Sequence, residues 1–390
     1  MQAKRLLIVF CCVGISFLSN AQLVVPTAEA DAKSLQLYNE GRWKDLIDFG
    51  KQKLSDGIDF PLLQMRMGYA NFKLGNFAQS TIHYNKVKSV EPYSKTANYY
   101  LYLNNLYLNN QQVARFYANK LDENTKQEIK LQPFTISDVE TEISYKSPTN
   151  IRRQDAQFYR IGLGLNLGYN IHLQQSVALF NQTIDEPAMG LLGVRNPRNI
   201  AINQFEYYAK ASVAISSKLQ VIGGYHFVKT PFNNLEYNNH IGFAGLQLTT
   251  PYLHVKALAN FATISNTNYT QYDGVISLYP LGNTSLYSIS KGSYNNNFLI
   301  SQVLGFKVAK NTWLEANATF GEYLNLLDND ALYLYNDIDT KLFKVGGSLY
   351  TNISKKAILS INYTLDNKRL FNSNTNFNQH SITGGIKWTF

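Results

Sequence analysis

The six histidines of the sequence are the first residues to consider for catalytic or metal-binding chemistry. None lies in a His-Glu-x-x-His pattern or in a paired spacing that would bind zinc. His380 and Ser381 are adjacent, but successive residues of a strand point to opposite faces. They therefore cannot share the hydrogen bond that an activated serine nucleophile needs. We expect a protein without enzyme activity, catalytic residues, metal or cofactor.

The N-terminal residues exclude a second kind of chemistry. Lys4 and Arg5 precede an apolar run that ends in small residues at Ala21, the pattern of a secretory signal peptide. Its removal takes away Cys11 and Cys12, the two cysteines of the chain, so thiolate chemistry and cysteine-ligated metals are not expected. It also lowers the net charge from +9 to +7. Because a secreted chain seldom meets nucleic acid, we do not expect that partner despite the basic charge.

The C-terminal part of the chain is predicted to form a β-barrel. Apolar and polar residues alternate there in segments that are separated in turn by tight connections and by longer polar loops. A strict alternation of tight and long connections along the chain is typical of a transmembrane barrel and not of a β-sandwich. We predict 14 antiparallel strands, over residues 138–147, 157–170, 176–184, 202–216, 219–230, 239–250, 252–265, 269–280, 284–292, 297–309, 312–326, 340–354, 357–370 and 379–390. Three of them alternate poorly, so 12 and 16 strands are alternatives.

Charged residues lie on the strand faces opposite the apolar ones, and we assign them to the lumen. They are Arg160, Glu206, Lys210, Lys256, Glu315, Lys344, Asp366 and Lys387. Two interpretations are open. A net cationic lining would favour anionic solutes or an anionic polymer. Alternatively, the charges pair with one another and plug the barrel.

The segment before the strands repeats itself. Gly41, Gly75 and Asn109 are 34 residues apart, a period typical of stacked helix pairs. The residues that define the repeat are Gly41, Trp43, Gly68, Gly75, Phe77, Tyr84 and Pro92. Stacked pairs leave a concave face for a partner protein. Candidates to line such a groove, or alternatively to pack between helices, are Tyr99, Tyr100, Tyr102 and Tyr107.

Residues 31–122 resemble about three tetratricopeptide repeats, and the middle copy carries the most specific motif. Signal peptide, repeats and barrel together are similar to Bacteroidota-type outer-membrane proteins with a periplasmic tetratricopeptide domain, with the YaiO-like barrels as the nearest group. The resemblance implies an outer-membrane location with the repeats in the periplasm. It also implies that the C-terminal aromatic residue, Phe390, is an insertion signal for the barrel insertion machinery.

The expected organisation is a signal peptide over residues 1–21, a linker over 22–30, repeats over 31–122, a linker over 123–137 and an outer-membrane barrel over 138–390. The first functional hypothesis is a scaffold, in which the repeats bind a periplasmic protein and the barrel anchors it in outer-membrane lipid. The alternative is an export or diffusion channel for an anionic solute or polysaccharide.

Overall fold

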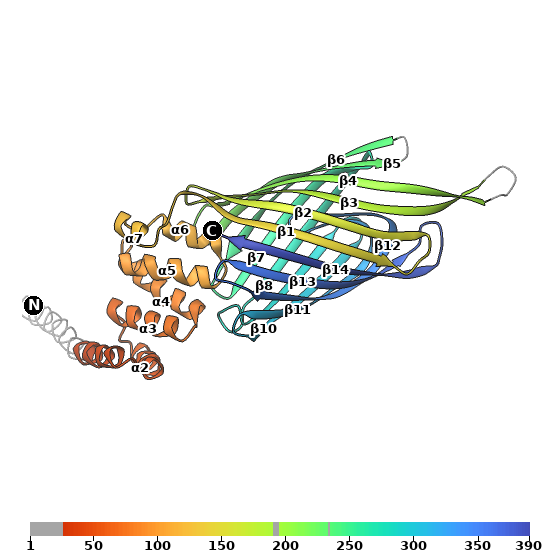
Figure 1. Ribbon diagram of the computed structural model, residues 1–390. Coiled ribbons are helices and arrows are strands. Elements are labelled where there is room, and N and C mark those ends of the chain that lie inside the picture. Colours follow the sequence, from red (N-terminus) through yellow and green to blue (C-terminus); the bar gives the residue numbers. More distant parts are fainter. Residues whose placement is uncertain (1–25, 190–194, 233–234) are drawn as a thin grey trace, which may run out of the picture. The chain divides into compact units, whose positions relative to one another are not determined.

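The computed structural model describes residues 26–189, 195–232 and 235–390. The predicted signal peptide and both cysteines lie outside these residues. The chain divides into two units, Met1–Leu108 and Asn109–Phe390, which are described separately (Figure 1).

The first unit is a stack of helices joined by short turns. Residues 26–39 are helical, and then follow α2 (Trp43–Ser55), α3 (Pro61–Lys73), α4 (Phe77–Val90) and α5 (Lys95–Tyr107). From α2 to α5, each helix contacts the next. Gly41, Gly75 and Asn109, the residues spaced by the sequence period, have φ angles of 68°, 76° and 59°. The same left-handed conformation, which often follows the end of a helix, therefore recurs at the period found in the sequence.

The interior of this unit depends on close packing between α3 and α4. Tyr84 is 1% exposed, and a Cβ atom at Gly68 would lie 2.9 Å from its ring. Gly68 therefore lets the tyrosine approach the α3 backbone. Pro92 lies in the turn between α4 and α5.

The second unit begins with two short helices, α6 (Gln111–Ala118) and α7 (Glu123–Glu128). Arg115 of α6 donates hydrogen bonds to the backbone oxygens of Gln132, Pro133 and Gly168. Its guanidinium also lies 5.6 Å from the centre of the Tyr169 ring. These contacts explain why α6 groups with the barrel, although the sequence period assigned it to the third repeat.

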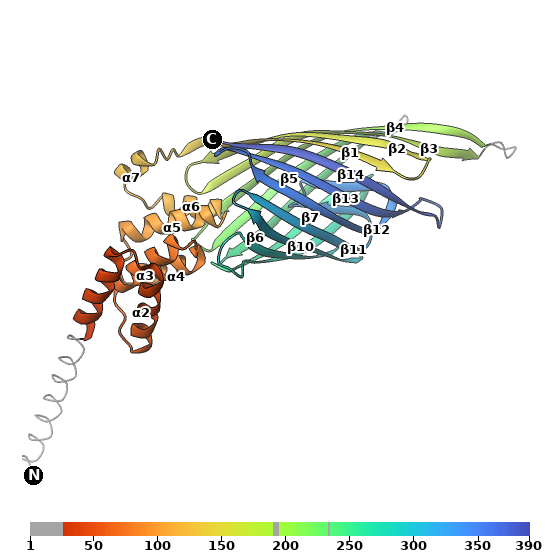
Figure 2. The ribbon, with the colours of Figure 1, turned by 60° about the horizontal axis from the view of Figure 1, so that its bottom comes forward.

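The rest of the second unit is a closed barrel of 14 antiparallel strands, the number predicted (Figures 1 and 2). Each strand pairs with its neighbours in the chain, and the first pairs with the last. The strands are β1 (Phe134–Pro148), β2 (Arg153–Leu167), β3 (Ile171–Met189), β4 (Arg195–Ala214), β5 (Leu219–Phe232), β6 (Leu235–Thr249), β7 (Leu253–Ile264), β8 (Thr267–Leu278), β9 (Leu286–Tyr294), β10 (Phe298–Ala309), β11 (Thr312–Asp328), β12 (Tyr333–Asn352), β13 (Ala357–Arg369) and β14 (Asn376–Thr389).

The seam that closes the barrel joins β1 and β14. Their register runs from Asp138 opposite Thr389 to Pro148 opposite Gln379. The backbone nitrogen of Phe390 then donates to the backbone oxygen of Ser137 at 3.1 Å. The last strand therefore pairs on both edges and leaves no open sheet edge.

The connections between strands differ from the prediction at both ends of the barrel. The turns β2–β3, β4–β5, β6–β7, β10–β11 and β12–β13 are short, as expected, and their end is called the short-turn end here. At the same end, the β8–β9 connection was expected to be tight over 281–283 but spans residues 279–285. At the opposite end, the long polar loops expected from the sequence are largely paired strand. The expected loop 185–201, for example, contains the ends of β3 and β4, which pair from Asp185 opposite Asn199 to Met189 opposite Arg195. Polar side chains did not stop these strands because ladder hydrogen bonds need only the backbone.

The outer face of the barrel is apolar, as contact with lipid requires. Exposed large apolar residues on it include Phe205, Phe261, Leu304, Phe320 and Ile361. A closed barrel with such a surface is the architecture of an outer-membrane protein. No helix within the described residues is long and apolar enough to cross a membrane.

One hairpin leaves the barrel wall and enters the lumen. The pairing of β11 with β10 ends at Phe320, and the pairing of β12 with β13 begins at Thr340. Residues 321–339 pair only within themselves and with β12 at Lys341. At the point of departure, Gly321 has a φ angle of 121°, which other residues rarely adopt. We call residues 321–339 the lumen hairpin.

The lumen hairpin crosses to the opposite side of the barrel. Its tip residues Leu327, Ala331, Leu332 and Leu334 are buried against inward-facing residues of β4 to β7, among them Tyr208, Val228 and Phe243. Those strands lie half-way round the ring from β11 and β12. The hairpin therefore bridges the lumen from wall to wall.

Candidate functional site

The backbone of the hairpin tip is held by side chains of the opposite wall. Tyr208 donates to the backbone oxygen of Asp330 at 3.0 Å, and His226 Nδ1 donates to that of Ala331 at 2.7 Å. Gln271 donates to the backbone oxygen of Leu327 at 2.7 Å and accepts from its nitrogen at 3.0 Å. These contacts satisfy backbone groups that would otherwise be buried without partners.

The acidic side chains near the tip bind basic residues of the wall. Asp330 lies 3.2 Å from Lys210 Nζ and also contacts Lys256. Asp328 lies 3.0 Å from Lys291 Nζ. The tip therefore fixes three lysines that project from different strands into the lumen.

The base of the hairpin is fixed by a second set of ion pairs. Asp339 accepts two hydrogen bonds from the Arg153 guanidinium, at 2.6 and 2.7 Å. The exposed fractions of these two side chains are only 2% for Arg153 and 1% for Asp339. Asp337 contacts Lys368 and lies 3.9 Å from Lys341. Bidentate arginine–carboxylate pairs in such buried positions are among the stronger polar contacts of proteins.

A third cluster joins the hairpin to β1 and β2. Tyr333 donates its hydroxyl hydrogen to Glu142 at 2.6 Å. Arg160 pairs with Glu142 at 2.8 Å and with Glu140, and its guanidinium lies 5.7 Å from the centre of the Tyr333 ring. The hairpin thus contacts wall residues from both halves of the barrel.

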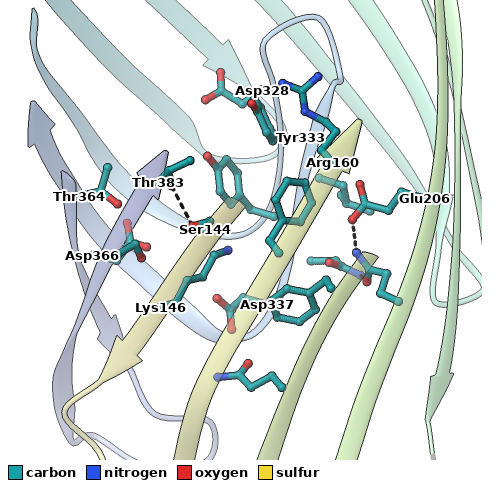
Figure 3. Close-up of a pocket in the computed structure, with 18 of the residues that line it drawn as sticks. Ser144, Lys146, Arg160, Glu206, Asp328, Tyr333, Asp337, Thr364, Asp366 and Thr383 are labelled. Carbon is teal, nitrogen blue, oxygen red and sulfur yellow. Dashed lines mark hydrogen bonds between the residues drawn. The ribbon is translucent and has the colours of Figure 1, made fainter. Parts of the chain in front are cut away.

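Two cavities flank the hairpin. The larger, of about 950 Å³, lies against β1, β2 and β12 to β14 and extends to Ser265 and Phe371 at the end opposite the short turns. Figure 3 shows Lys146 and Asp366 of the wall, and Tyr333 and Asp337 of the hairpin, around this cavity. The smaller, of about 470 Å³, is lined by wall residues of β6 to β13 and by hairpin residues 328–330.

The strand register arranges the wall of the larger cavity in polar rows. Ser144 of β1 lies opposite Thr383 of β14, which lies opposite Asn362 of β13, and Thr383 donates to Ser144 at 2.8 Å (Figure 3). The next row contains Lys146, Ser381 and Thr364. Side chains two residues apart share a face, so these rows lie side by side on the inner wall.

The residues that the sequence assigned to the lumen all lie on the inner wall. Arg160, Glu206, Lys344, Asp366 and Lys387 line the larger cavity, while Lys256, Glu315 and again Lys344 line the smaller. Lys210 faces Asp330. The structure brings most of their charges into pairs, which favours the second of the two interpretations left open by the sequence.

Sequence reasoning missed other basic residues of the lumen and all the acidic residues of the hairpin. The missed basic residues are Lys146, Arg153, Lys291, Lys341 and Lys368. For Lys146 a signal was present, because it shares the period-two face of Glu140, Glu142 and Ser144.

The histidines are not gathered into a site. His83 Nδ1 lies 2.6 Å from Gln64 in the helical unit, and His226 binds the hairpin. His380 points outward and contacts the hydroxyl of Tyr363, whereas Ser381 is buried on the inner face. Within the described residues, no three histidine, cysteine or acidic side chains are placed to hold a metal ion.

The tyrosines proposed for a partner groove are divided between packing and exposure. Tyr100 stacks on Tyr84 with ring centres 4.9 Å apart and also contacts Tyr69. Tyr107 stacks on Phe77 but is 55% exposed. Tyr99 and Tyr102 are half-buried.

No protein-family model and no curated protein sequence matches the chain. Among solved structures, the Ralstonia pickettii toluene transporter TbuX is similar with a TM-score of 0.48 and 8% identity, over 65% of this chain and 90% of that chain. The Pseudomonas putida toluene transporter TodX has a TM-score of 0.42 and 10% identity, over 67% and 90%. The translocator domain of the Neisseria meningitidis autotransporter NalP has a TM-score of 0.34 and 11% identity, over 73% and 99%. These similarities concern the fold alone.

Proposed function

We propose that this protein is an outer-membrane channel that the lumen hairpin closes and that admits anionic solutes when the hairpin withdraws. The observation that carries the proposal is the departure of residues 321–339 from the wall at Gly321. The ring remains hydrogen-bonded without this segment, because β10–β11 and β12–β13 pair up to Phe320 and from Thr340. A closing element that is separate from the wall can move without opening the barrel.

The charge distribution supports the preference for anions. Withdrawal of Asp328, Asp330 and Asp339 would leave Lys291, Lys210, Lys256 and Arg153 without these counter-charges. Basic residues projecting into a low-dielectric passage concentrate anions and repel cations.

Conductance tests the proposal. In planar lipid bilayers, we expect the full-length protein to open rarely and a variant with residues 321–339 replaced by a short glycine–serine turn to conduct continuously. In a salt gradient, the reversal potential of that variant should show anion preference. Cation preference, or a replaced variant that conducts no more than the full-length protein, would contradict the proposal.

The helical unit supports a second function, the binding of a partner protein. The specific observation is Tyr107 at the end of α5, which stacks on Phe77 and is nevertheless 55% exposed. We propose that the repeats lie in the periplasm and hold a partner there, while Phe390 directs insertion of the barrel. Crosslinking in cells from a photoreactive residue at position 107, followed by mass spectrometry, should identify one periplasmic protein. Recovery of none would contradict this role.

A further inference from the structure

Lys146 places a positive charge in the larger cavity without a carboxylate in direct contact, although Asp366 and Asp337 act on it at longer range. It lies on the inner face of β1, and its Nζ is 5.3 Å from the centre of the Phe180 ring. Within the described residues it forms no hydrogen bond, and no carboxylate oxygen lies within ion-pair distance of it. A half-buried ammonium group of this kind is stabilised by an anion that enters the cavity.

Two hydroxyl groups lie in the same row of the wall. Ser381 is opposite Lys146 across the seam, and Thr364 is opposite Ser381 on the next strand. Both side chains line the larger cavity, and in the part of the chain that the structure describes neither hydroxyl has a hydrogen-bond partner. They offer donors or acceptors beside the ammonium group.

The adjacent row contains a buried acceptor that lacks a donor. Asp366 is 4% exposed and lines the same cavity. Its Oδ2 lies 3.7 Å from Lys341 Nζ, whereas Oδ1 has no hydrogen-bond partner among the described residues. Leaving such an atom without a donor is unfavourable, because the hydrogen bonds that water gave it in the unfolded chain are not replaced. This oxygen is itself almost fully covered, so a ligand with a hydroxyl group would satisfy it once the carboxylate rotates toward the cavity.

We infer that the larger cavity is a binding site for a hydroxylated carboxylate of the sugar-acid class. The carboxylate binds Lys146, and a ring hydroxyl donates to Asp366 Oδ1, with Ser381 and Thr364 beside the ring. This inference deepens the proposed function, since it names the class of solute that the channel would take.

The spacing of the two groups fits a ligand of this size. Lys146 and Asp366 are two strands and one row apart, which places their Cα atoms about 12 Å from each other. Because the Lys146 ammonium group reaches toward Phe180 of β3 and not toward β13, the ligand has to span roughly this separation, which a sugar acid with a hydrogen bond at each end does. The cavity volume of about 950 Å³ is also within the range of small-molecule sites. Rings of Phe158, Phe180 and Tyr333 supply the apolar part of the lining.

Calorimetric titration of the full-length protein in detergent micelles tests the site with three probes: D-glucuronate, D-glucose and acetate. We expect glucuronate to bind at least about tenfold more tightly than the other two, because only glucuronate supplies both groups. Lys146→Gln should reduce the glucuronate affinity by about tenfold or more. Asp366→Asn should reduce the difference in affinity between glucuronate and acetate. Only glucuronate has a hydroxyl group that donates to Asp366, so only its affinity should fall.

Lys229→Gln is the matched control. Lys229 pairs with Glu236 at 2.9 Å on the surface and does not line the cavity, so its replacement should leave binding unchanged. Circular dichroism establishes that all variants retain the barrel. Equal binding of glucose and glucuronate, or unchanged affinity in Lys146→Gln, would overturn the inference. If the hairpin-replaced variant still conducts anions in that case, the proposed channel stands and only its ligand class fails. If glucuronate binds but no variant conducts, the binding site stands and the proposed channel fails.

Discussion

Replacing Asp330 by asparagine should weaken the docking of the lumen hairpin while leaving its shape unchanged. The Asp330 side chain is 7% exposed and contacts both Lys210 and Lys256. Removing one partner of a buried ion pair typically costs about 3–5 kcal/mol, because the other charge stays buried. The two lysines retain some contact with water, at 18% and 19% exposure. We therefore expect a loss of about 2–3 kcal/mol of docking free energy.

A loss of this size raises the ratio of withdrawn to docked hairpin by roughly 30- to 150-fold. Single-channel recording in planar bilayers measures the change as an increase in open probability. Glu322→Gln is the control, because Glu322 lies in the same hairpin but pairs with Arg369 where both side chains are more than one-third exposed. Such a pair is worth at most about 1 kcal/mol. The reasoning is refuted if Asp330→Asn opens no more often than Glu322→Gln.

Three further changes have defined outcomes. In Gly321→Val, the new Cβ atom would lie 2.6 Å from Leu299 Cδ2, and the backbone would have to keep a φ of 121°. We therefore expect the free energy of unfolding, measured by urea denaturation, to fall by on the order of 1–3 kcal/mol. An unchanged unfolding midpoint would contradict this. Burial lowers the pKa of His83 to about 4 from 6.5, so the unfolded state binds more protons between these values. The free energy of unfolding of the helical unit should therefore fall by up to ~3 kcal/mol as the pH drops from 6.5 to 4, which hydrogen exchange in α4 measures. His83→Gln should remove this pH dependence. A pH dependence that persists in the variant would contradict the prediction. Deletion of Phe390 should reduce the amount of barrel in outer-membrane fractions, and normal insertion would show that the residue is not a signal.

The barrel could be predicted from the sequence because its strands obey a local rule. Residues such as Phe205 and Phe261 alternate with polar neighbours, and the alternation alone indicates which face meets lipid. The pairing of β1 with β14 followed from closure, since an open edge is not viable in a membrane. Strand ends were less accurate, because backbone pairing continues into polar segments such as 185–201.

The lumen hairpin could not be located from local pattern. Residues 321–339 contain five acidic residues and no basic one, a composition that also suits an exposed loop. Their position depends on partners far away in the sequence, for example Lys210 for Asp330 and Arg153 for Asp339. Without the hairpin, the assigned lumen residues leave an excess of positive charge, with five basic and three acidic side chains. The pairing of those charges is a tertiary property.

The central claim is that the hairpin closes the channel by occupying the lumen. The most direct test joins the tip to the opposite wall through cysteines at positions 226 and 331, where His226 Nδ1 lies 2.7 Å from the Ala331 backbone oxygen. The chain has no other cysteines beyond Cys11 and Cys12, so a short reducible thiol crosslinker is specific in a protein that lacks the predicted signal peptide, residues 1–21. In the Asp330→Asn background, the linked protein should stay closed and should begin to open when reductant cleaves the link. Equal opening before and after reduction would contradict the claim.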